Sequence, residues 1–372
     1  MSLAIAGMGW VTPLGNDVAD VWRQLHEGVV ASAESISSPE GKTFSVYKVP
    51  AAATAQLPPH PRLRRSSAIS RFAAAAGLAA LKDAGVDLTP DVAARMGLVF
   101  AVSNGGVIYT RRFYDEIVDK DARAASPLLF PETVFNAPAS HLAAILGLTG
   151  ATYTLVGDGA TGILAVKMAE DLIRNHNLDY CLVVGTEETD WLLCDAYRKW
   201  RLLRRTPPIE LFRVSPKGTI LSEGAGAVLL GRSGAIQIGS IDAGTNFEKQ
   251  TEAGDAMEAI FCRLCQDRFD LIVGSANGTF VDAAEHAAIL RHGPTARTLF
   301  PKVALGESVG ASGLWQIICG GQALLTQSAP DKWVGSSETE IAPASGPIEI
   351  RRVMISVCGL NQQATGLTLV SN

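Results

Sequence analysis

One stretch in the middle of the chain predicts a strand, a tight turn and a helix in direct succession. Residues 149–162 read Thr-Gly-Ala-Thr-Tyr-Thr-Leu-Val-Gly-Asp-Gly-Ala-Thr-Gly, and an apolar-periodic segment follows to about Asn175. β-Formers run into small residues and then into helical periodicity, which gives this order of elements. A side chain at the apex of such a turn lies at a helix N-terminus, where backbone N–H groups stabilise an anion and would lower the pKa of a cysteine. The apex residue here is Gly159.

The spacing of this stretch resembles the active-site segment of β-ketoacyl synthases of the thiolase superfamily. That segment reads Val-x-Thr-Ala-Cys-Ala-Ser/Thr-Gly where its helix begins. In this chain Ala160, Thr161 and Gly162 are in register with it, and Gly159 takes the place of the cysteine. The resemblance therefore implies a degenerate nucleophile elbow at residues 157–162, from which the nucleophile is absent.

Strand and helix patterns alternate along most of the chain, which predicts βαβ units with helical cover. The expected strands include residues 3–12, 96–103 and 178–187, and the expected helices include residues 17–27, 67–84 and 137–146. Residues 32–63 are polar and nonperiodic, so we expect a long surface loop there. The resemblance implies an α/β, thiolase-like fold, in which two duplicated βαβαβαββ halves form a five-layered αβαβα core. Residues 1–234 would form the N-terminal half and residues 235–372 the C-terminal half of one unit.

The other parts of a condensing active site can be sought in the second half. A decarboxylating condensation needs a thiolate to carry the acyl chain, two imidazoles to stabilise the enolate, and a lysine that fixes the local charge pattern. Residues 270–285 resemble the family segment Ala-His-Gly-Thr-Gly-Thr-x-x-x-Asp-x-x-Glu, with Asn277 at the histidine. Residues 302–313 match Lys-Ser-x-x-Gly-His-x-x-Gly-Ala-x-Gly, with Lys302 retained and Glu307 at the histidine. A carboxylate at that position would repel a developing enolate.

The C-terminal segment changes together with these positions. Residues 356–364 lack the phenylalanine and two glycines of the family's Gly-Phe-Gly-Gly-x-Asn loop. Within the superfamily the chain resembles the chain-length factors of type II polyketide synthases, which are noncatalytic subunits that pair with an active ketosynthase and shape its acyl tunnel. The resemblance implies a heterodimer with an active ketosynthase, an acyl carrier protein that is reached through that partner, and a polyketide product of aromatic, highly reduced or aryl-polyene type.

The resemblance also implies where a tunnel and a subunit interface lie. The candidates are Ile108, Tyr109, Arg112, Tyr153, Leu155, Gly157 and Asp158. An ordinary surface helix explains the first three equally well.

A cluster of positive charge follows the expected strand at residues 178–187. It comprises Arg198, Lys199, Arg201, Arg204 and Arg205. Phosphopantetheine or an acidic carrier protein would suit this cluster, because guanidinium groups bind phosphate through paired hydrogen bonds. A solvated loop ahead of Pro207 is the simpler explanation.

Two other functions remain open from the sequence. A stand-alone thioester decarboxylase or hydrolase could use Asp158, Thr161 and Glu307 as its site. Each of these residues also has a structural explanation: Asp158 as a helix cap, Thr161 as a packing residue, and Glu307 as the partner of Lys302. A homodimeric acyl-binding scaffold is the second alternative.

Composition adds limits on partners and compartment. The net charge of −5 gives no reason to expect binding to nucleic acid or a membrane surface, and no run of about 18 apolar residues is present. We therefore expect a cytoplasmic protein without a cofactor. The content of 47% hydrophobic and 19% charged residues suggests a sizeable subunit interface. Cys262 and Cys265 share a helical pattern without a second cysteine or histidine pair, so we expect buried structural thiols and no metal site.

Overall fold

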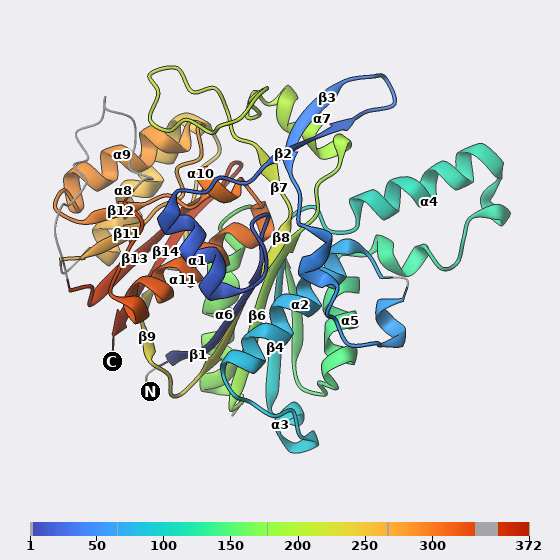
Figure 1. The fold of residues 1–372 in the computed structure, drawn as a ribbon, viewed down its shortest axis with the longest axis horizontal. Helices are drawn as coiled ribbons and strands as arrows, with labels where there is room; N and C mark the ends of the chain where they lie inside the picture. The colour runs from blue at the N-terminus through green and yellow to red at the C-terminus, as the bar shows by residue number, and fades with distance from the viewer. Residues whose placement is uncertain (1–2, 65, 177, 266–267, 332–348, 372) are drawn as a thin grey trace.

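A mixed β-sheet runs through the whole molecule and carries its helices on both faces (Figure 1). The computed structural model describes residues 3–64, 66–176, 178–265, 268–331 and 349–371. Within these residues the sheet has 11 strands in the order β12-β11-β13-β14-β9-β1-β8-β6-β4-β5, and β10 pairs with β14. The strands are β1 (Leu3–Val11), β4 (Met96–Val102), β5 (Thr152–Val156), β6 (Tyr180–Glu187), β8 (Gly224–Gly231), β9 (Ile236–Ile241), β10 (Thr245–Asn246), β11 (Leu271–Val273), β12 (Arg297–Leu299), β13 (Arg352–Cys358) and β14 (Gln363–Ser371).

The same arrangement of five strands occurs twice in this sheet. In the first half β4 lies parallel to β5 and β6, and β8 runs antiparallel between β6 and β1. In the second half β11 lies parallel to β12 and β13, and β14 runs antiparallel between β13 and β9. The two first strands, β1 and β9, pair antiparallel and join the halves. The boundary that we expect between residues 234 and 235 lies between β8 and β9.

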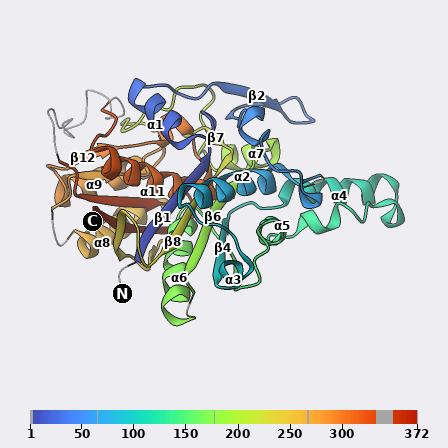
Figure 2. The same ribbon diagram turned by 60° about the horizontal axis from the view of Figure 1, so that its bottom comes forward.

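The helices complete the five layers that the family resemblance implies. α6 and α11 pack against each other in the middle and contact strands of both halves, whereas α2 and α5 cover the first half and α8 and α9 cover the second (Figures 1 and 2). The helices are α1 (Val18–Glu27), α2 (Ala68–Asp83), α3 (Pro90–Ala94), α4 (Val107–Lys120), α5 (Ala137–Leu146), α6 (Thr161–Asn175), α7 (Trp191–Lys199), α8 (Ala253–Leu264), α9 (Val281–His292), α10 (Lys302–Leu305) and α11 (Val309–Thr326). Within the described residues, no helix is both long and apolar enough to cross a membrane.

The central helix α11 is apolar around its whole circumference and is buried along most of its length. Its glycines allow this depth of burial. A Cβ atom at Gly310 would overlap the carbonyl oxygen of Thr186 on β6, and Gly313 faces Gly162 of α6. Close backbone packing therefore requires glycine at position 310, whereas Gly162 and Gly313 face each other at ordinary van der Waals distances.

The prediction of one long loop over residues 32–63 is wrong in part. β2 (Ala33–Ser37) and β3 (Thr43–Tyr47) form an antiparallel hairpin, and β3 continues into a parallel pair with β7 (Leu221–Ser222). The side chains of β2 are mostly exposed, so its sequence lacks the apolar alternation that marks a half-buried strand. A partner strand far along the chain, which a local pattern does not reveal, completes this small sheet.

Helix α4 extends away from the body of the fold in both views (Figures 1 and 2). It begins directly after Gly105 and Gly106, and the chain returns through η3 (Ala122–Ala124) and η4 (Phe130–Thr133) to α5. A Cβ atom at Gly106 would overlap the carbonyl oxygen of Glu132, and the ring of Phe135 lies against Gly105. The glycine pair therefore lets the returning chain pack on the start of α4. We call residues 107–135 the arm.

Removal of buried volume from α11 tests the central role of this helix. Leu314 is fully buried, so we expect Leu314→Ala to lower the free energy of unfolding by about 2–5 kcal/mol, as large-to-small substitutions in cores do. Leu325 lies on the same helix but is 51% exposed, and Leu325→Ala should change stability by less than about 0.5 kcal/mol. Denaturant unfolding measures both values. Equal losses in the two variants would contradict the packing described here.

Candidate functional site

The turn between β5 and α6 forms where the sequence predicts it. β5 ends at Val156 and α6 begins at Thr161. The Oδ1 atom of Asp158 accepts a hydrogen bond from the backbone N–H of Ala160 at 3.1 Å, which closes the turn as aspartate side chains commonly do. Thr161 is buried at the start of the helix, in agreement with a packing role.

The backbone at Gly159 leaves space for a side chain. A Cβ atom built there would meet the Cα atom of Gly359 at 3.5 Å and the carbonyl oxygen of Cys358 at 3.9 Å, which are ordinary van der Waals distances. The φ angle of Gly159 also lies outside the left-handed region that favours glycine. Neither conformation nor crowding therefore requires glycine at the apex, and the loss of the nucleophile is not imposed by the fold.

Asp158 connects the elbow to the C-terminal loop between β13 and β14. Its Oδ2 atom accepts hydrogen bonds from the backbone N–H groups of Gln362 at 3.0 Å and Gln363 at 3.3 Å. The same carboxylate lies directly against Gly359, where a Cβ atom would overlap it. The sequence suggested Asp158 as a helix cap, a tunnel residue or part of a thioester-processing site; α6 begins without a side-chain cap, so the first role of Asp158 is to close the turn. Its second role depends on a loop more than 200 residues away in the chain.

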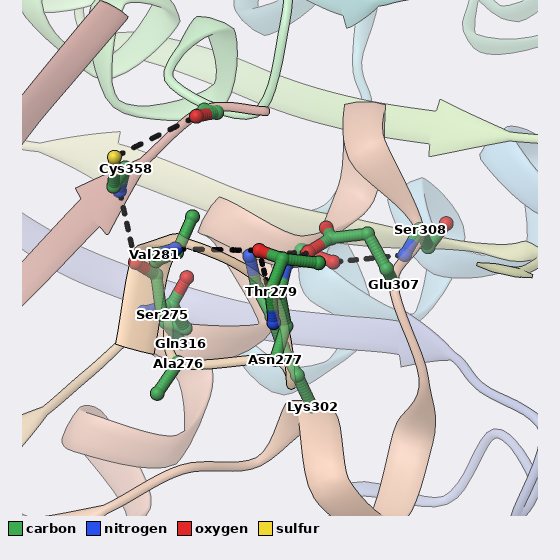
Figure 3. A network of polar contacts seen from close by, with 12 residues as sticks. Ser275, Ala276, Asn277, Thr279, Val281, Lys302, Glu307, Ser308, Gln316 and Cys358 are labelled. Atoms are coloured by element: carbon green, nitrogen blue, oxygen red, sulfur yellow. Dashed lines mark hydrogen bonds and ion pairs between the residues drawn. The ribbon is translucent and has the colours of Figure 1, made fainter. Parts of the chain in front are cut away.

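Three side chains that the family motifs single out in the second half, Asn277, Lys302 and Glu307, converge in one buried network (Figure 3). The Oε2 atom of Glu307 accepts a hydrogen bond from Asn277 Nδ2 at 2.7 Å and forms an ion pair with Lys302 Nζ at 2.8 Å. Asn277 Oδ1 accepts from Thr279 Oγ1 at 2.6 Å. Asn277 is fully buried, and Lys302 and Glu307 are each 2% exposed. The explanation of Glu307 as the partner of Lys302 is thus confirmed.

The polar groups of this network are engaged with one another. The ammonium group of Lys302 is already neutralised by Glu307, and the amide N–H of Asn277 is directed to the same carboxylate oxygen. Glu307 Oε1 is buried and has no hydrogen-bond partner among the described residues. Additional negative charge beside this carboxylate would be unfavourable in a buried environment.

Two acidic side chains hold the loop that carries Asn277, and the analysis of single motif positions missed them. Asp282 Oδ1 accepts from the backbone N–H groups of Asn277 and Gly278, and Glu285 accepts from those of Ser275 and Ala276. Burial raises the pKa of Glu285 to about 7, although its hydrogen bonds oppose the rise. The Asp-x-x-Glu spacing in residues 270–285 was the available signal for these positions.

The remaining thiol near the elbow does not replace the missing cysteine. Cys358 lies beside Gly159, but it is 1% exposed. Burial, and then the charge of Glu285, raises the pKa of the Cys358 thiol well above its usual range. A protonated, inaccessible thiol is a poor nucleophile.

The tunnel candidates fall into two groups in the structure. On α4, Ile108 and Tyr109 are half-buried, and the Arg112 guanidinium lies over the Tyr109 ring at 5.5 Å. Burial raises the pKa of Tyr109 to about 12, and the nearby Glu188 adds to the rise. These side chains therefore lie at the base of the arm, and Arg112 itself is exposed.

The second group of candidates lies on β5 and the turn that follows it. Tyr153 is 43% exposed on this edge strand, whereas Leu155 is half-buried against the main core. Gly157 is exposed and Asp158 is half-buried. The candidates thus include both surface and interior positions around the elbow.

Four residues of the basic cluster line one surface cavity. The cavity has a volume of about 410 Å³, and its lining includes Lys217 together with Arg198, Arg201, Arg204 and Arg205. Asp195 neutralises part of the cluster, because it pairs with Arg198 at 2.7 Å and with Lys199 at 3.0 Å. Arg204 pairs with Glu210, and its Nη1 atom is buried without a hydrogen-bond partner among the described residues. The cluster is therefore a built basic pocket and only partly a solvated loop.

The prediction that both cysteines of the Cys262/Cys265 pair are buried is wrong. Cys262 is exposed and Cys265 is half-buried, whereas the other four cysteines are buried. The helical pattern correctly places Cys262 on α8, but it does not show that this face of the helix is turned to solvent.

The first half of the chain is similar in sequence to known condensing-enzyme domains. The N-terminal domain of beta-ketoacyl synthases matches residues 2–234, which is more than half of the chain. This protein therefore belongs to the beta-ketoacyl synthase family. Its sequence is 26% identical over 236 residues to 3-oxoacyl-[acyl-carrier-protein] synthase 2 of Vibrio harveyi. The match covers 61% of this chain and 57% of that relative's length.

Solved structures confirm the thiolase-like ketosynthase fold over the full chain. The ishigamide ketosynthase/chain length factor superposes with a TM-score of 0.87 at 19% identity, over 100% of this chain and 99% of that chain. The ketosynthase ApeO in complex with its chain length factor ApeC from Xenorhabdus doucetiae gives a TM-score of 0.79 at 18% identity, over 100% and 98% of the two chains. At these identities the similarity establishes the fold.

Removal of Lys302 tests the buried ion pair. Lys302→Met would leave the Glu307 carboxylate buried without its cation, and we expect a loss of about 3–5 kcal/mol in the free energy of unfolding. The double variant Lys302→Met/Glu307→Gln carries no buried charge at this site and should recover most of the loss. Denaturant unfolding at neutral pH measures both.

A matched control uses an ion pair at the surface. Arg351 pairs with Glu349 at 2.8 Å, and both side chains are mostly exposed. Arg351→Met should leave the unfolding midpoint unchanged, because exposed pairs contribute little. A Lys302→Met variant as stable as this control would show that Glu307 is not held as a buried anion.

Proposed function

We propose that this chain is a noncatalytic ketosynthase-like subunit, of the chain-length-factor type, that pairs with an active beta-ketoacyl synthase and shapes the tunnel for the growing acyl chain. The observation that carries the proposal is the buried network at the catalytic positions. Gly159, Asn277 and Glu307 stand where the family has its cysteine and two histidines, and Lys302 is paired with Glu307. A scaffold that keeps its packing glycines and loses all three reacting groups is suited to a structural role.

The distribution of exposed apolar side chains supports a partner. Eleven large hydrophobic side chains are exposed among the described residues, and eight of them lie on the arm and on β5. The eight are Tyr114, Val118, Leu128, Phe130, Val134, Phe135, Tyr153 and Val156. Concentrated apolar exposure marks interaction surfaces. We call this set the apolar face.

The edge of the sheet adds a second reason for association. β5 is the last strand of its half, and its outer side has no strand beside it among the described residues. Tyr153 and Val156 on this strand are 43% and 52% exposed. An exposed edge strand with apolar side chains is a template for pairing with another chain. A related ketosynthase subunit that presents the same edge is the partner we propose.

In this proposal the partner ketosynthase determines which product is made and which carrier protein is used. The tunnel would receive side chains from both subunits, so Ile108, Tyr109 and Arg112 are the positions at which we expect substitutions to alter product length. The basic pocket around Arg201 and Arg204 would suit an acidic carrier protein or its phosphopantetheine phosphate. Highly reduced and aryl-polyene chains are the product classes that we favour.

The contacts at the elbow argue against a stand-alone thioester decarboxylase or hydrolase. Asp158 is engaged with Gln362 and Gln363, and Glu307 is engaged with Lys302. Asp158 or Glu307 would have to break these contacts in order to act as a base on a substrate. Turnover of malonyl or acyl thioesters by the isolated protein, abolished in Asp158→Ala, would favour that alternative over ours. A stable homodimer that ignores every ketosynthase would favour an acyl-binding scaffold.

The decisive experiment is co-expression with a ketosynthase that retains its cysteine and two histidines. We expect a one-to-one complex by size exclusion with light scattering, and elongation of malonyl-loaded carrier protein by the complex only. Replacement of the partner's reactive cysteine should abolish elongation, whereas Gly159→Cys in this chain should not restore it. Elution of this protein alone from an equimolar mixture would overturn the proposal.

One substitution tests the apolar face directly. Val156→Asp places a charge on the exposed edge of β5, and we expect affinity for the ketosynthase partner to fall on the order of tenfold or more. Val214 is 99% exposed but lies outside this face, so Val214→Asp should bind the partner as the unchanged chain does. Titration of labelled partner measures both affinities. Equal binding of the two variants would place the interface elsewhere.

A further inference from the structure

A cysteine, a histidine and a carboxylate meet on the outer surface of the second half. Glu258 and Cys262 are four residues apart on α8, so they lie on one face of that helix. His292 is the last residue of α9, which packs against α8. One ligand atom from each residue lies within 4.8 Å of the other two. His292 is 30 residues from Cys262 and on another helix, so no local spacing in the sequence reveals this group.

The chemistry of these three groups is that of a transition-metal site. Thiolate and imidazole are preferred ligands of Zn²⁺, and a carboxylate oxygen is a common third ligand. An exposed thiol can release its proton to bind a metal ion, and Cys262 is the exposed cysteine among the described residues. Glu258 and His292 are partly accessible, with 28% and 19% of their side chains exposed. An ion can therefore reach the group from solvent.

The distances agree with a tetrahedral ion after a small adjustment. Bond lengths of about 2.3 Å to sulfur and about 2.1 Å to nitrogen or oxygen put the ligand atoms of such an ion about 3.4–3.6 Å apart. Cys262 Sγ lies 3.7 Å from His292 Nε2 and 3.9 Å from Glu258 Oε1. The His292 Nε2 to Glu258 Oε1 distance is 2.7 Å, which is a hydrogen bond. Loss of the shared proton and an opening of about 0.7 Å would convert this bond into two metal bonds.

We propose that Glu258, Cys262 and His292 bind one divalent transition-metal ion, with Zn²⁺ as the preferred ion, and that a water molecule completes its coordination. The thiolate and the carboxylate together balance the charge of the ion. Arg291 Nη1 now pairs with Glu258 Oε1 at 2.9 Å, but this side chain is 70% exposed and can turn into solvent when the ion binds. The ion would link the C-terminal end of α9 to α8 and stabilise the outer layer of this half.

This site is separate from the proposed function. The residues that hold the Asn277 loop, Asp282 and Glu285, lie in the first turns of α9, whereas His292 lies at its other end. A metal at the C-terminal end of α9 is therefore a structural clamp and supplies no group to the catalytic positions. Failure of the metal experiment would leave the ketosynthase-pairing proposal untouched, and the reverse also holds.

Zn²⁺ and Co²⁺ titrations of the reduced, chelator-treated full chain test the site. We expect one Zn²⁺ per chain by calorimetry, and a thermal midpoint that rises with Zn²⁺ concentration, because a ligand of the folded state stabilises it. Bound Co²⁺ should show a thiolate-to-metal charge-transfer band and the visible absorption of a tetrahedral ion. Cys262→Ser and His292→Gln should each weaken Zn²⁺ binding on the order of tenfold or more, and Cys262→Ser should remove the charge-transfer band.

A cysteine on the same helix provides the matched control. Cys265 is half-buried and its Sγ atom contacts Met354 Sδ at 3.6 Å, away from the three ligand atoms. Cys265→Ser should bind Zn²⁺ and Co²⁺ as the unchanged chain does. No Zn²⁺ binding by the unchanged chain, unaltered binding by folded Cys262→Ser, or a Co²⁺ spectrum without the thiolate band would overturn the proposal. Circular dichroism confirms that each variant is folded.

Discussion

The packing of α6 against α11 is the contact on which the rest of the structure depends. The two helices lie between the halves of the sheet, and each contacts strands of both. The two helices meet where Gly162 faces Gly313, and Gly310 lets α11 lie against the carbonyl group of Thr186 on β6. The candidate site is assembled at the N-terminal ends of the same helices, where Gly159 precedes α6 and Glu307 precedes α11. Fold and site share backbone supports, so the reacting side chains can change while the backbone is kept.

The buried ion pair shows how charged groups are held in the interior at the candidate site. A lysine at 2% exposure needs a partner, because an uncompensated buried charge is strongly destabilising. Glu307 supplies that partner from five residues away, and Asn277 donates to the same oxygen. The polar groups that a condensing enzyme would leave free for substrate are satisfied by one another. The Glu307 Oε1 atom stays buried without a hydrogen-bond partner among the described residues, so the network balances its charges without satisfying every polar atom.

The two halves share a strand order but differ at their outer edges. The third strand of each half ends the sheet, as β5 on one side and β12 on the other. β12 is three residues long and mostly buried, whereas β5 exposes Tyr153 and Val156. Only the first half therefore presents an apolar edge among the described residues. The two outer edges of the sheet therefore differ in exposed apolar surface.

The sequence by itself determined the features that depend on residues close together in the chain. The elbow was predictable because β-formers, small residues and helical periodicity follow one another between Thr152 and Asn175, and the Lys302–Glu307 pair was predictable because its members are close in the chain. Only the tertiary structure decided which distant groups meet. Asp158 holds the loop at Gln362, β3 pairs with β7, and Cys262 lies beside His292. These contacts join segments that carry no mark of one another, because chain folding and not local periodicity sets the distance between them.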